Sequence, residues 1–186
     1  VKVNHQQPSS RWYSGSGIYR NVKLVVMDDV HVERYGTFVT TPNLETLYGQ
    51  NKAEVSIETK VENDGEKDVS VIVTSTIYDS EGNMFASPAV SQAQKIAAGS
   101  TMSYMQTVPT GKPELWSVDS PALYKVVSEV QVDGRTVDTY ETTFGFRWVT
   151  MDPDEGFFLN GEYMKLNGMC MHHDQGALGA VANYRA

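Results

Sequence analysis

Apolar and polar residues alternate in short runs along most of the chain. In residues 54–62, valine, isoleucine and threonine occupy the odd positions, whereas glutamate, serine and lysine occupy the even positions. Successive side chains of a β-strand point to opposite faces of the sheet, so this alternation predicts a strand with one buried face and one face in water. The same pattern returns in residues 69–77 and 124–132, each bounded by turn-forming residues.

About seven such strands are expected between Val30 and Val149, and no segment of helical length shows a 3.6-residue apolar period. The expected strands are residues 32–41, 55–61, 69–77, 92–96, 102–108, 124–132 and 135–146. Asp133-Gly134, between the last two, is a strong hairpin signal. Short strands with regular turns predict an all-β fold, an immunoglobulin-like β-sandwich. Cys170 is the only cysteine, which excludes a disulfide-pinned domain of the antibody type.

Both flanks of the expected sandwich carry further signals. Residues 17–26 have apolar side chains at alternate positions, which predicts another strand. Residues 152–156 form a linker-like cluster of turn residues, and Asn160-Gly161 between two apolar runs predicts a second hairpin. Residues 168–174 are apolar at first and polar at the end, which predicts a buried strand whose last residues reach a surface or cleft.

Length and charge then limit the class of protein. The 186 residues make one domain and a remainder, too few for a (β/α)8 barrel of roughly 250 residues. A net charge of −8 and a pI of about 4.9 argue against nucleic-acid and anionic membrane partners. Neither a long apolar run nor a basic-then-apolar leader is present, so we expect no membrane span and no signal peptide in this chain. A bacterial periplasmic and a cytoplasmic location both stay open.

The two ends of the chain suggest a piece of a longer protein. The sequence begins with Val1 instead of methionine and stops at Ala186 in the middle of a pattern. The first 27 residues contain basic side chains and no acidic ones, whereas all 23 acidic residues follow. We therefore expect the N-terminal segment to belong to a different structural unit.

Reactive side chains gather in residues 170–174. On a strand, Cys170, His172 and Asp174 would share one face, with His173 on the other. A metal site is disfavoured because alternate residues on one strand enclose an ion poorly. A cysteine–histidine nucleophile pair is disfavoured because Cys170 follows an apolar run and is expected to be buried. A polar patch that binds the hydroxyl groups of a ligand and a purely structural pair of histidines both remain, and spacing alone does not choose between them.

The other candidate positions favour structural roles. Trp116 and Trp148 are expected in the core or at its seam, because aromatic side chains dominate cores. Glu54, Glu58 and Glu62 lie on the solvent side of their strand, and spacing locates no pair of catalytic carboxylates. The glycines in residues 15–17 precede a strand pattern instead of a helix, so they fail the context of a dinucleotide fingerprint. We expect no cofactor and no metal.

Several motifs, in order along the chain, resemble glycoside hydrolase family 2. Residues 11–22, Arg-Trp-Tyr-Ser-Gly-Ser-Gly-Ile-Tyr-Arg-Asn-Val, are similar to the end of its sugar-binding jelly-roll domain. Residues 116–124, Trp-Ser-Val-Asp-Ser-Pro-Ala-Leu-Tyr, resemble a segment of its immunoglobulin-like domain. Phe-Gly-Phe-Arg at 144–147, Phe-Leu-Asn-Gly at 158–161 and Lys-Leu-Asn-Gly at 165–168 resemble the passage into its catalytic barrel. His-His-Asp-Gln-Gly-Ala-Leu-Gly at 172–179 is similar to the end of the first barrel strand in its β-galactosidase members.

The resemblance implies a domain order. Residues 1–29 would be the C-terminal remnant of the sugar-binding jelly-roll, 30–149 the immunoglobulin-like sandwich, and 150–186 the truncated start of a TIM-barrel catalytic domain. In the family, two glutamates from later barrel strands perform retaining hydrolysis, and the acid/base glutamate follows an asparagine. This chain has no Asn-Glu dipeptide, so no catalytic residue is expected in it.

The resemblance also implies a few binding residues. His172 matches a histidine that contacts the sugar in the active site, and Arg11 falls near a loop that approaches that site in some members. Cys170 stands where family members commonly have asparagine, so the resemblance does not extend to the hydrogen bonding around His172.

These observations lead to one main hypothesis and its alternatives. The chain is expected to be the non-catalytic middle domain of a family 2 enzyme that hydrolyses terminal β-galactosides, with that parent's sugar-binding and barrel domains as partners. Residues 157–171 are strongly apolar, and we expect them to pack back on the sandwich, to mediate self-association or to be mobile. The alternatives are a stand-alone carbohydrate-binding or adhesin-like sandwich module, and a fragment of a β-glucuronidase or β-mannosidase.

Overall fold

The computed structural model describes residues 2–4, 6, 17, 18, 20–170, 178 and 185. The chain divides into two compact units, one of residues 1–26 and 167–186 and one of Met27–Leu166. All named strands and the one named helix lie in the unit Met27–Leu166. Among the described residues, no helix has the length and apolar character that crossing a membrane requires.

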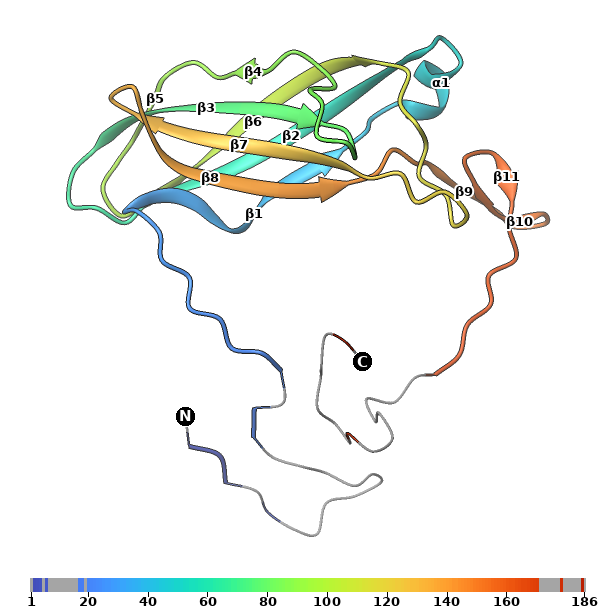
Figure 1. The fold of residues 1–186 in the computed structure, drawn as a ribbon, viewed down its shortest axis with the longest axis horizontal. Coiled ribbons are helices and arrows are strands. Elements are labelled where there is room, and N and C mark those ends of the chain that lie inside the picture. Colours follow the sequence, from blue (N-terminus) through green and yellow to red (C-terminus); the bar gives the residue numbers. More distant parts are fainter. Residues whose placement is uncertain are drawn as a thin grey trace. The chain divides into compact units, whose positions relative to one another are not determined.

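Two antiparallel sheets form the body of the unit Met27–Leu166 (Figure 1). The first has the order β1-β2-β6, and its strands are β1 (Val30–Thr40), β2 (Lys52–Asn63) and β6 (Ser100–Gly111). The second has the order β4-β3-β7-β8 with β5 also on β3, and its strands are β3 (Val69–Tyr78), β4 (Ala89–Val90), β5 (Gln94–Ile96), β7 (Tyr124–Val132) and β8 (Arg135–Phe144). This order agrees with that of immunoglobulin-type sandwiches.

The remaining elements lie at one end of the sandwich (Figure 1). The helix α1 (Leu44–Tyr48) connects β1 to β2 and buries Leu44. A third, small sheet follows β8, and its strands are β9 (Val149–Asp152), β10 (Gly156–Leu159) and β11 (Glu162–Tyr163). The Asn160-Gly161 pair turns the chain between β10 and β11, with φ angles of 55° and 83°.

The alternation in the sequence becomes the inner and outer faces of the first sheet. On β2, Val55, Ile57 and Val61 are fully buried, while the glutamates between them point outward and are partly exposed. Strand β2 pairs with β6 over its whole length, so the inner residues of both strands face the second sheet. The burial pattern therefore confirms the predicted all-β sandwich and its one-sided strands.

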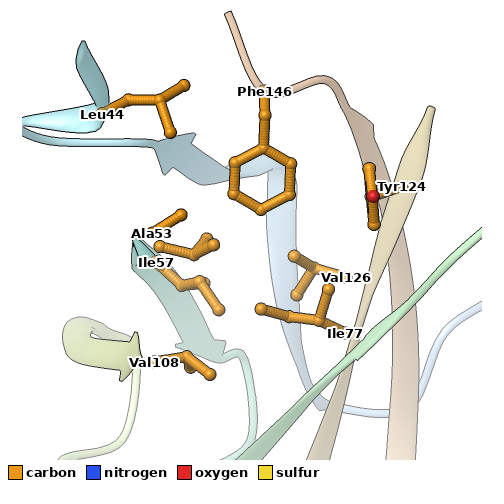
Figure 2. Close-up of a cluster of buried hydrophobic side chains, with 9 residues drawn as sticks. Leu44, Ala53, Ile57, Ile77, Val108, Tyr124, Val126 and Phe146 are labelled. Carbon is orange, nitrogen blue, oxygen red and sulfur yellow. The ribbon is translucent and has the colours of Figure 1, made fainter. Parts of the chain in front are cut away.

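The core between the sheets consists of two clusters of apolar side chains. The cluster nearer to the β9–β11 end combines Ile57, Ile77 and Val126 with the rings of Tyr124 and Phe146 (Figure 2). These two rings pack edge to face at 4.8 Å. Such aromatic pairs contribute beyond the area they bury, so they anchor this end of the sandwich.

Polar side chains also join the two sheets inside the core. Gln106 of β6 is 6% exposed and accepts a hydrogen bond of 2.7 Å from the Ser75 hydroxyl of β3. Its amide nitrogen donates to the carbonyl groups of Val73 and Ala89, at 3.1 and 2.8 Å. Buried polar groups are costly unless they are paired, so these bonds favour one alignment of the two sheets.

Some sequence predictions differ from the structure. The weak strand expected at 92–96 is confirmed in part as β5, and the short strand β4, which was not predicted, lies just before it. The helix α1 was not predicted because a helix of five residues is too short to show a 3.6-residue period. The turn residues 152–156 close the hairpin between β9 and β10 instead of forming a linker. The Asp152 carboxylate accepts from the backbone nitrogens of Asp154 and Glu155 at 2.8 Å each, and these bonds lower its pKa.

The strands predicted in the flanks are wrong where the structure describes them. Residues 17, 18 and 20–26 form no strand, and Leu24 is 91% exposed. Residues 168–170 are likewise exposed and outside any strand, so the predicted burial of Cys170 is also wrong. A strand needs a neighbouring backbone edge to pair with, and among the described residues neither segment pairs with one.

Candidate functional site

The residues that the sequence marked as binding residues lie outside the described part of the chain. Neither His172 nor Arg11 is described, and the same holds for His173 and Asp174. Cys170 is described and exposed. The candidate site that the structure does show is the end of the sandwich at which the β9–β11 hairpin is attached. We call this region the hairpin junction and define it by Trp116, Gly145, Arg147, Trp148 and Asn160.

Asn160 holds the hairpin against the sandwich. Its backbone nitrogen donates to the Trp148 carbonyl at 3.0 Å, and its side-chain oxygen accepts from the Trp148 nitrogen at 3.2 Å. Its side-chain nitrogen donates to the Trp116 carbonyl at 3.0 Å. The left-handed backbone conformation of Asn160 suits asparagine better than most residues. One side chain therefore links the turn of the hairpin to two segments that are distant in sequence.

A close backbone approach explains the glycine beside this contact. The Trp116 nitrogen donates to the Phe146 carbonyl at 2.8 Å, which brings the Trp116 segment alongside residues 145–147. A Cβ atom on Gly145 would lie 2.9 Å from the Trp116 Cβ, closer than non-bonded carbon atoms come. Only glycine fits at this position without a shift of the backbone.

The two tryptophans occupy the positions expected of core or seam residues. Trp148 is half-buried, packs against the core cluster of Figure 2, and lies 5.9 Å from the ring of Tyr48. Its indole nitrogen is buried and has no hydrogen-bond partner among the described residues. Trp116 is also half-buried, and the Arg147 guanidinium covers its ring at 4.6 Å. A ring covered in this way is a poor platform for a sugar.

Tyr124 fixes the segment that carries Trp116. The Tyr124 ring is 6% exposed, and its hydroxyl oxygen accepts from the Glu114 nitrogen at 2.9 Å. Burial raises the pKa of Tyr124, because the phenolate form is disfavoured away from water. The neutral hydroxyl therefore holds residue 114 at the edge of the core over the physiological pH range.

A surface hollow of about 460 Å³ lies at the hairpin junction. Its lining residues are Val39, Thr40, Thr41, Trp116, Leu123, Phe144, Gly145 and Arg147. This lining includes one cation and several apolar groups but no carboxylate, imidazole or thiol. General acid–base catalysis needs such groups, so the hollow suits a contact with another part of a protein better than a reaction.

Sequence reasoning missed two features of the described structure. The roles of Asn160 and Gly145 depend on contacts with Trp116, which is 44 residues from Asn160, and only the Asn-Gly turn was visible in the sequence. His31, Glu62 and Asp64 come together at the opposite end of β1 as the one group of potential metal ligands among the described residues. The register of β1 against β2 brings them together, and no local spacing signals it.

The chain resembles known glycosidases in sequence. Residues 30–147 match the family model described as "Glycosyl hydrolases family 2". A β-galactosidase of Bacteroides ovatus, BoGH2A, is 39% identical over 98% of this chain and 21% of its own length. A putative β-glucuronidase of Formosa agariphila is 34% identical over 96% of this chain and 16% of its own length. The chain thus spans about a fifth of the length of these relatives.

Solved structures agree with the sequence comparison. A family 2 glycosyl hydrolase of Bacteroides cellulosilyticus superimposes with a TM-score of 0.84 at 36% identity, over 94% of this chain and 22% of that one. A β-glucuronidase of Bacteroides uniformis superimposes with a TM-score of 0.74 at 30% identity, over 84% of this chain and 19% of that one.

Proposed function

The chain belongs to glycosyl hydrolase family 2, and on that basis we propose that it forms the non-catalytic middle of a retaining β-galactosidase. In this proposal residues 30–149 are a rigid sandwich between two other domains. Residues 1–29 are the end of a sugar-binding domain, and residues 150–186 are the start of a catalytic barrel. The relatives are several times longer than this chain, which supports a parent with further domains.

The observation that carries the proposal is the set of Asn160 hydrogen bonds. They join the β9–β11 hairpin to the sandwich through both Trp116 and Trp148. In the proposed parent, the chain runs from this hairpin into the first barrel strand, which bears His172. A hairpin fixed in this way would set where that strand starts, and a misplacement of about 1 Å in a positioned group can slow an enzyme considerably.

The described carboxylates support a role without catalysis. A retaining glycosidase needs two carboxyl groups about 5–5.5 Å apart on either side of the scissile bond. Glu62 and Asp64 have oxygen atoms within 4.8 Å of each other, but they lie on the outer side of β2 and at its end. Glu62 also contacts the His31 imidazole at 3.3 Å. Glu62 is therefore engaged with a buried imidazole on the outer side of the sandwich.

The identity of the sugar rests on the relatives. The 39% identity to a β-galactosidase exceeds the 34% identity to a putative β-glucuronidase, so we propose terminal β-galactosides as the substrates of the parent. A β-glucuronidase is the second candidate, because relatives with that name cover nearly the whole chain. In either case His172 and Arg11 are the residues of this chain proposed to approach the sugar.

We propose that the apolar segment 157–171 contacts the catalytic barrel of the parent. The first part of this segment lies against the sandwich, and Leu159 within it is buried. Tyr163, Leu166 and Met169 are 63%, 61% and 93% exposed. Exposed apolar groups favour association, so we expect these side chains to contact the barrel in the parent and to favour self-association of the isolated chain.

The substrate proposal is tested with the full-length parent protein. Initial rates are measured with p-nitrophenyl β-galactoside and p-nitrophenyl β-glucuronide under identical conditions. We expect kcat/KM for the galactoside to exceed that for the glucuronide by about 100-fold or more, because a site built for a neutral sugar leaves the glucuronide carboxylate unpaired. The reverse preference would replace the β-galactosidase proposal with the β-glucuronidase one.

A further inference from the structure

Three potential metal ligands converge where β1 begins and β2 ends. In the antiparallel pairing of these strands His31 lies opposite Glu62, and Asp64 follows directly after β2. One ligand atom from each of the three side chains lies within 4.8 Å of the other two. The three residues are not used by the proposed function, because the hairpin junction is at the other end of the sandwich.

The imidazole of His31 is buried, and a backbone carbonyl holds one of its ring nitrogens. His31 is 5% exposed, and its Nδ1 lies 2.9 Å from the Asp28 carbonyl oxygen. A carbonyl oxygen can only accept, so Nδ1 carries the hydrogen and donates it. In the neutral ring, Nε2 then presents a lone pair, and it faces the Glu62 carboxylate at 3.3 Å. At this distance the contact is favourable when either a proton or a metal ion lies between the two atoms.

Metal-binding histidines commonly donate a hydrogen bond from their second ring nitrogen to a backbone carbonyl, as His31 does. Such a bond fixes the tautomer and orients the other nitrogen towards the ion. The Asp28 carbonyl takes this part for His31. The burial of the ring limits other orientations, so Nε2 is held towards the two carboxylates before any ion binds.

Hydrogen bonds also fix the backbone of the turn that carries Asp64. The Asp64 nitrogen donates to the Asp29 carbonyl at 2.8 Å. The buried Asn63 side chain donates to the carbonyls of Lys67, Ile96 and Ala97 and accepts from the Gly65 nitrogen. The backbone around Asp64 is therefore preorganised, and only the carboxylate itself has to rotate to reach an ion.

The charge around the cluster favours a cation. A hollow of about 630 Å³ adjoins it and is lined by Asp28, Asp29, Asp64 and Glu66, with Lys67 as the one cation among its described lining. The lysine–carboxylate pairs of the described residues, Lys95–Asp68 and Lys125–Glu141, do not include Glu62 or Asp64. A proton on Nε2 would engage Glu62 alone, whereas an ion bound there would be within reach of Glu62 and Asp64 together.

We propose that His31, Glu62 and Asp64 bind a divalent transition-metal ion, with Zn²⁺ as the best match. One imidazole nitrogen and two carboxylate oxygens are ligands that Zn²⁺ accepts at about 2.0–2.2 Å, with water in the fourth position. The side chain of Glu62 is partly exposed and Asp64 is exposed, so both can rotate to close the remaining distance. The bound ion would fasten the chain entering β1 to the end of β2.

The test is calorimetric titration of the chain with ZnCl₂. The three other histidines and the cysteine are first replaced, as His5→Gln, His172→Gln, His173→Gln and Cys170→Ser, so that the remaining histidine is His31. We expect one Zn²⁺ per chain and a rise in Tm that saturates with the metal, because an ion bound only by the folded state stabilises it. X-ray absorption of the bound zinc should show a single imidazole ligand.

Matched variants decide whether this cluster is the site. Glu62→Gln and Asp64→Asn should each weaken binding by about tenfold or more, and both positions are exposed enough to tolerate the change. Glu66→Gln removes the same charge in the same hollow but no proposed ligand, and it should bind as the unaltered chain does. Absence of saturable binding up to about 1 mM Zn²⁺, or equal binding by all three variants, would overturn the proposal.

Discussion

At the scale of single residues, the hairpin junction depends on two side chains whose importance comes from distant contacts. Gly145 leaves room for Trp116, and Asn160 bonds to both Trp116 and Trp148. Neither is chemically reactive, yet both set how the β9–β11 hairpin meets the sandwich. Substitutions at these positions should therefore lower the free energy of unfolding more than matched substitutions at control positions do.

Gly145→Ala should destabilise the chain by about 1–3 kcal/mol, because the added methyl group would lie 2.9 Å from the Trp116 Cβ. The free energy of unfolding is measured by urea denaturation. Gly111→Ala is the control, since nothing lies within 4 Å of a Cβ atom at that position, and it should change stability by less than about 0.5 kcal/mol. Equal effects of the two substitutions would contradict the close-approach argument.

Asn160→Ala should cost about 1–3 kcal/mol, because it removes two side-chain hydrogen bonds from partly buried backbone groups. Asp133→Ala is the control, because Asp133 also begins a two-residue turn with positive φ but makes no such bond to a distant segment. Amide exchange at Trp148 should accelerate in Asn160→Ala alone. A cost no greater than that of Asp133→Ala would mean that turn conformation, and not the junction, accounts for the effect.

At the scale of elements, strand β6 holds the two sheets together. Gln106 reaches the backbone of β3, and the Tyr104 hydroxyl donates to the Val71 carbonyl at 3.3 Å. Tyr104 is 1% exposed, and burial raises its pKa from 10.0 to about 12. Loss of the Tyr104 proton at alkaline pH should therefore weaken the contact between the two sheets.

Stability should fall as the pH rises from 10 towards 12. A tyrosine whose pKa is higher in the folded state binds its proton more tightly there, so its contribution is complete below pH 10 and is lost as the pH approaches 12. Urea midpoints measured across this range should decline less steeply in Tyr104→Phe. Tyr163→Phe, at a 63% exposed position, should leave the slope unchanged. Identical slopes in the unaltered chain and in Tyr104→Phe would refute the assignment.

The elements also show which parts of the fold are predictable from sequence. Strand β2 was predicted because its alternation directly reflects burial, and the turns at Asp133-Gly134 and Asn160-Gly161 were predicted because few residues adopt positive φ readily. The strand predicted in residues 17–26 was wrong. Alternating apolar residues favour a strand, but a strand forms only where another strand pairs with it. The helix α1 is too short to leave a periodic signal.

At the scale of the whole molecule, the sandwich is a structural part of a larger proposed enzyme. The all-β fold and the family were predicted, because strand patterns and the motifs at residues 116–124 and 144–147 are local in sequence. The hairpin junction and the His31 cluster were not predicted, since both depend on strand register and on contacts between distant segments. The roles of His172 and Arg11 stay predictions, because both residues lie outside the described part of the chain.

The central claim is that this chain performs no chemistry of its own. The most direct measurement is the hydrolysis of p-nitrophenyl β-galactoside by the purified chain, followed over a series of protein concentrations beside the full-length parent. The proposal predicts turnover by the parent and none by the chain above the buffer control, because two positioned carboxylates are needed. Turnover by the chain that scales with its concentration, and that Glu62→Gln abolishes, would contradict the claim.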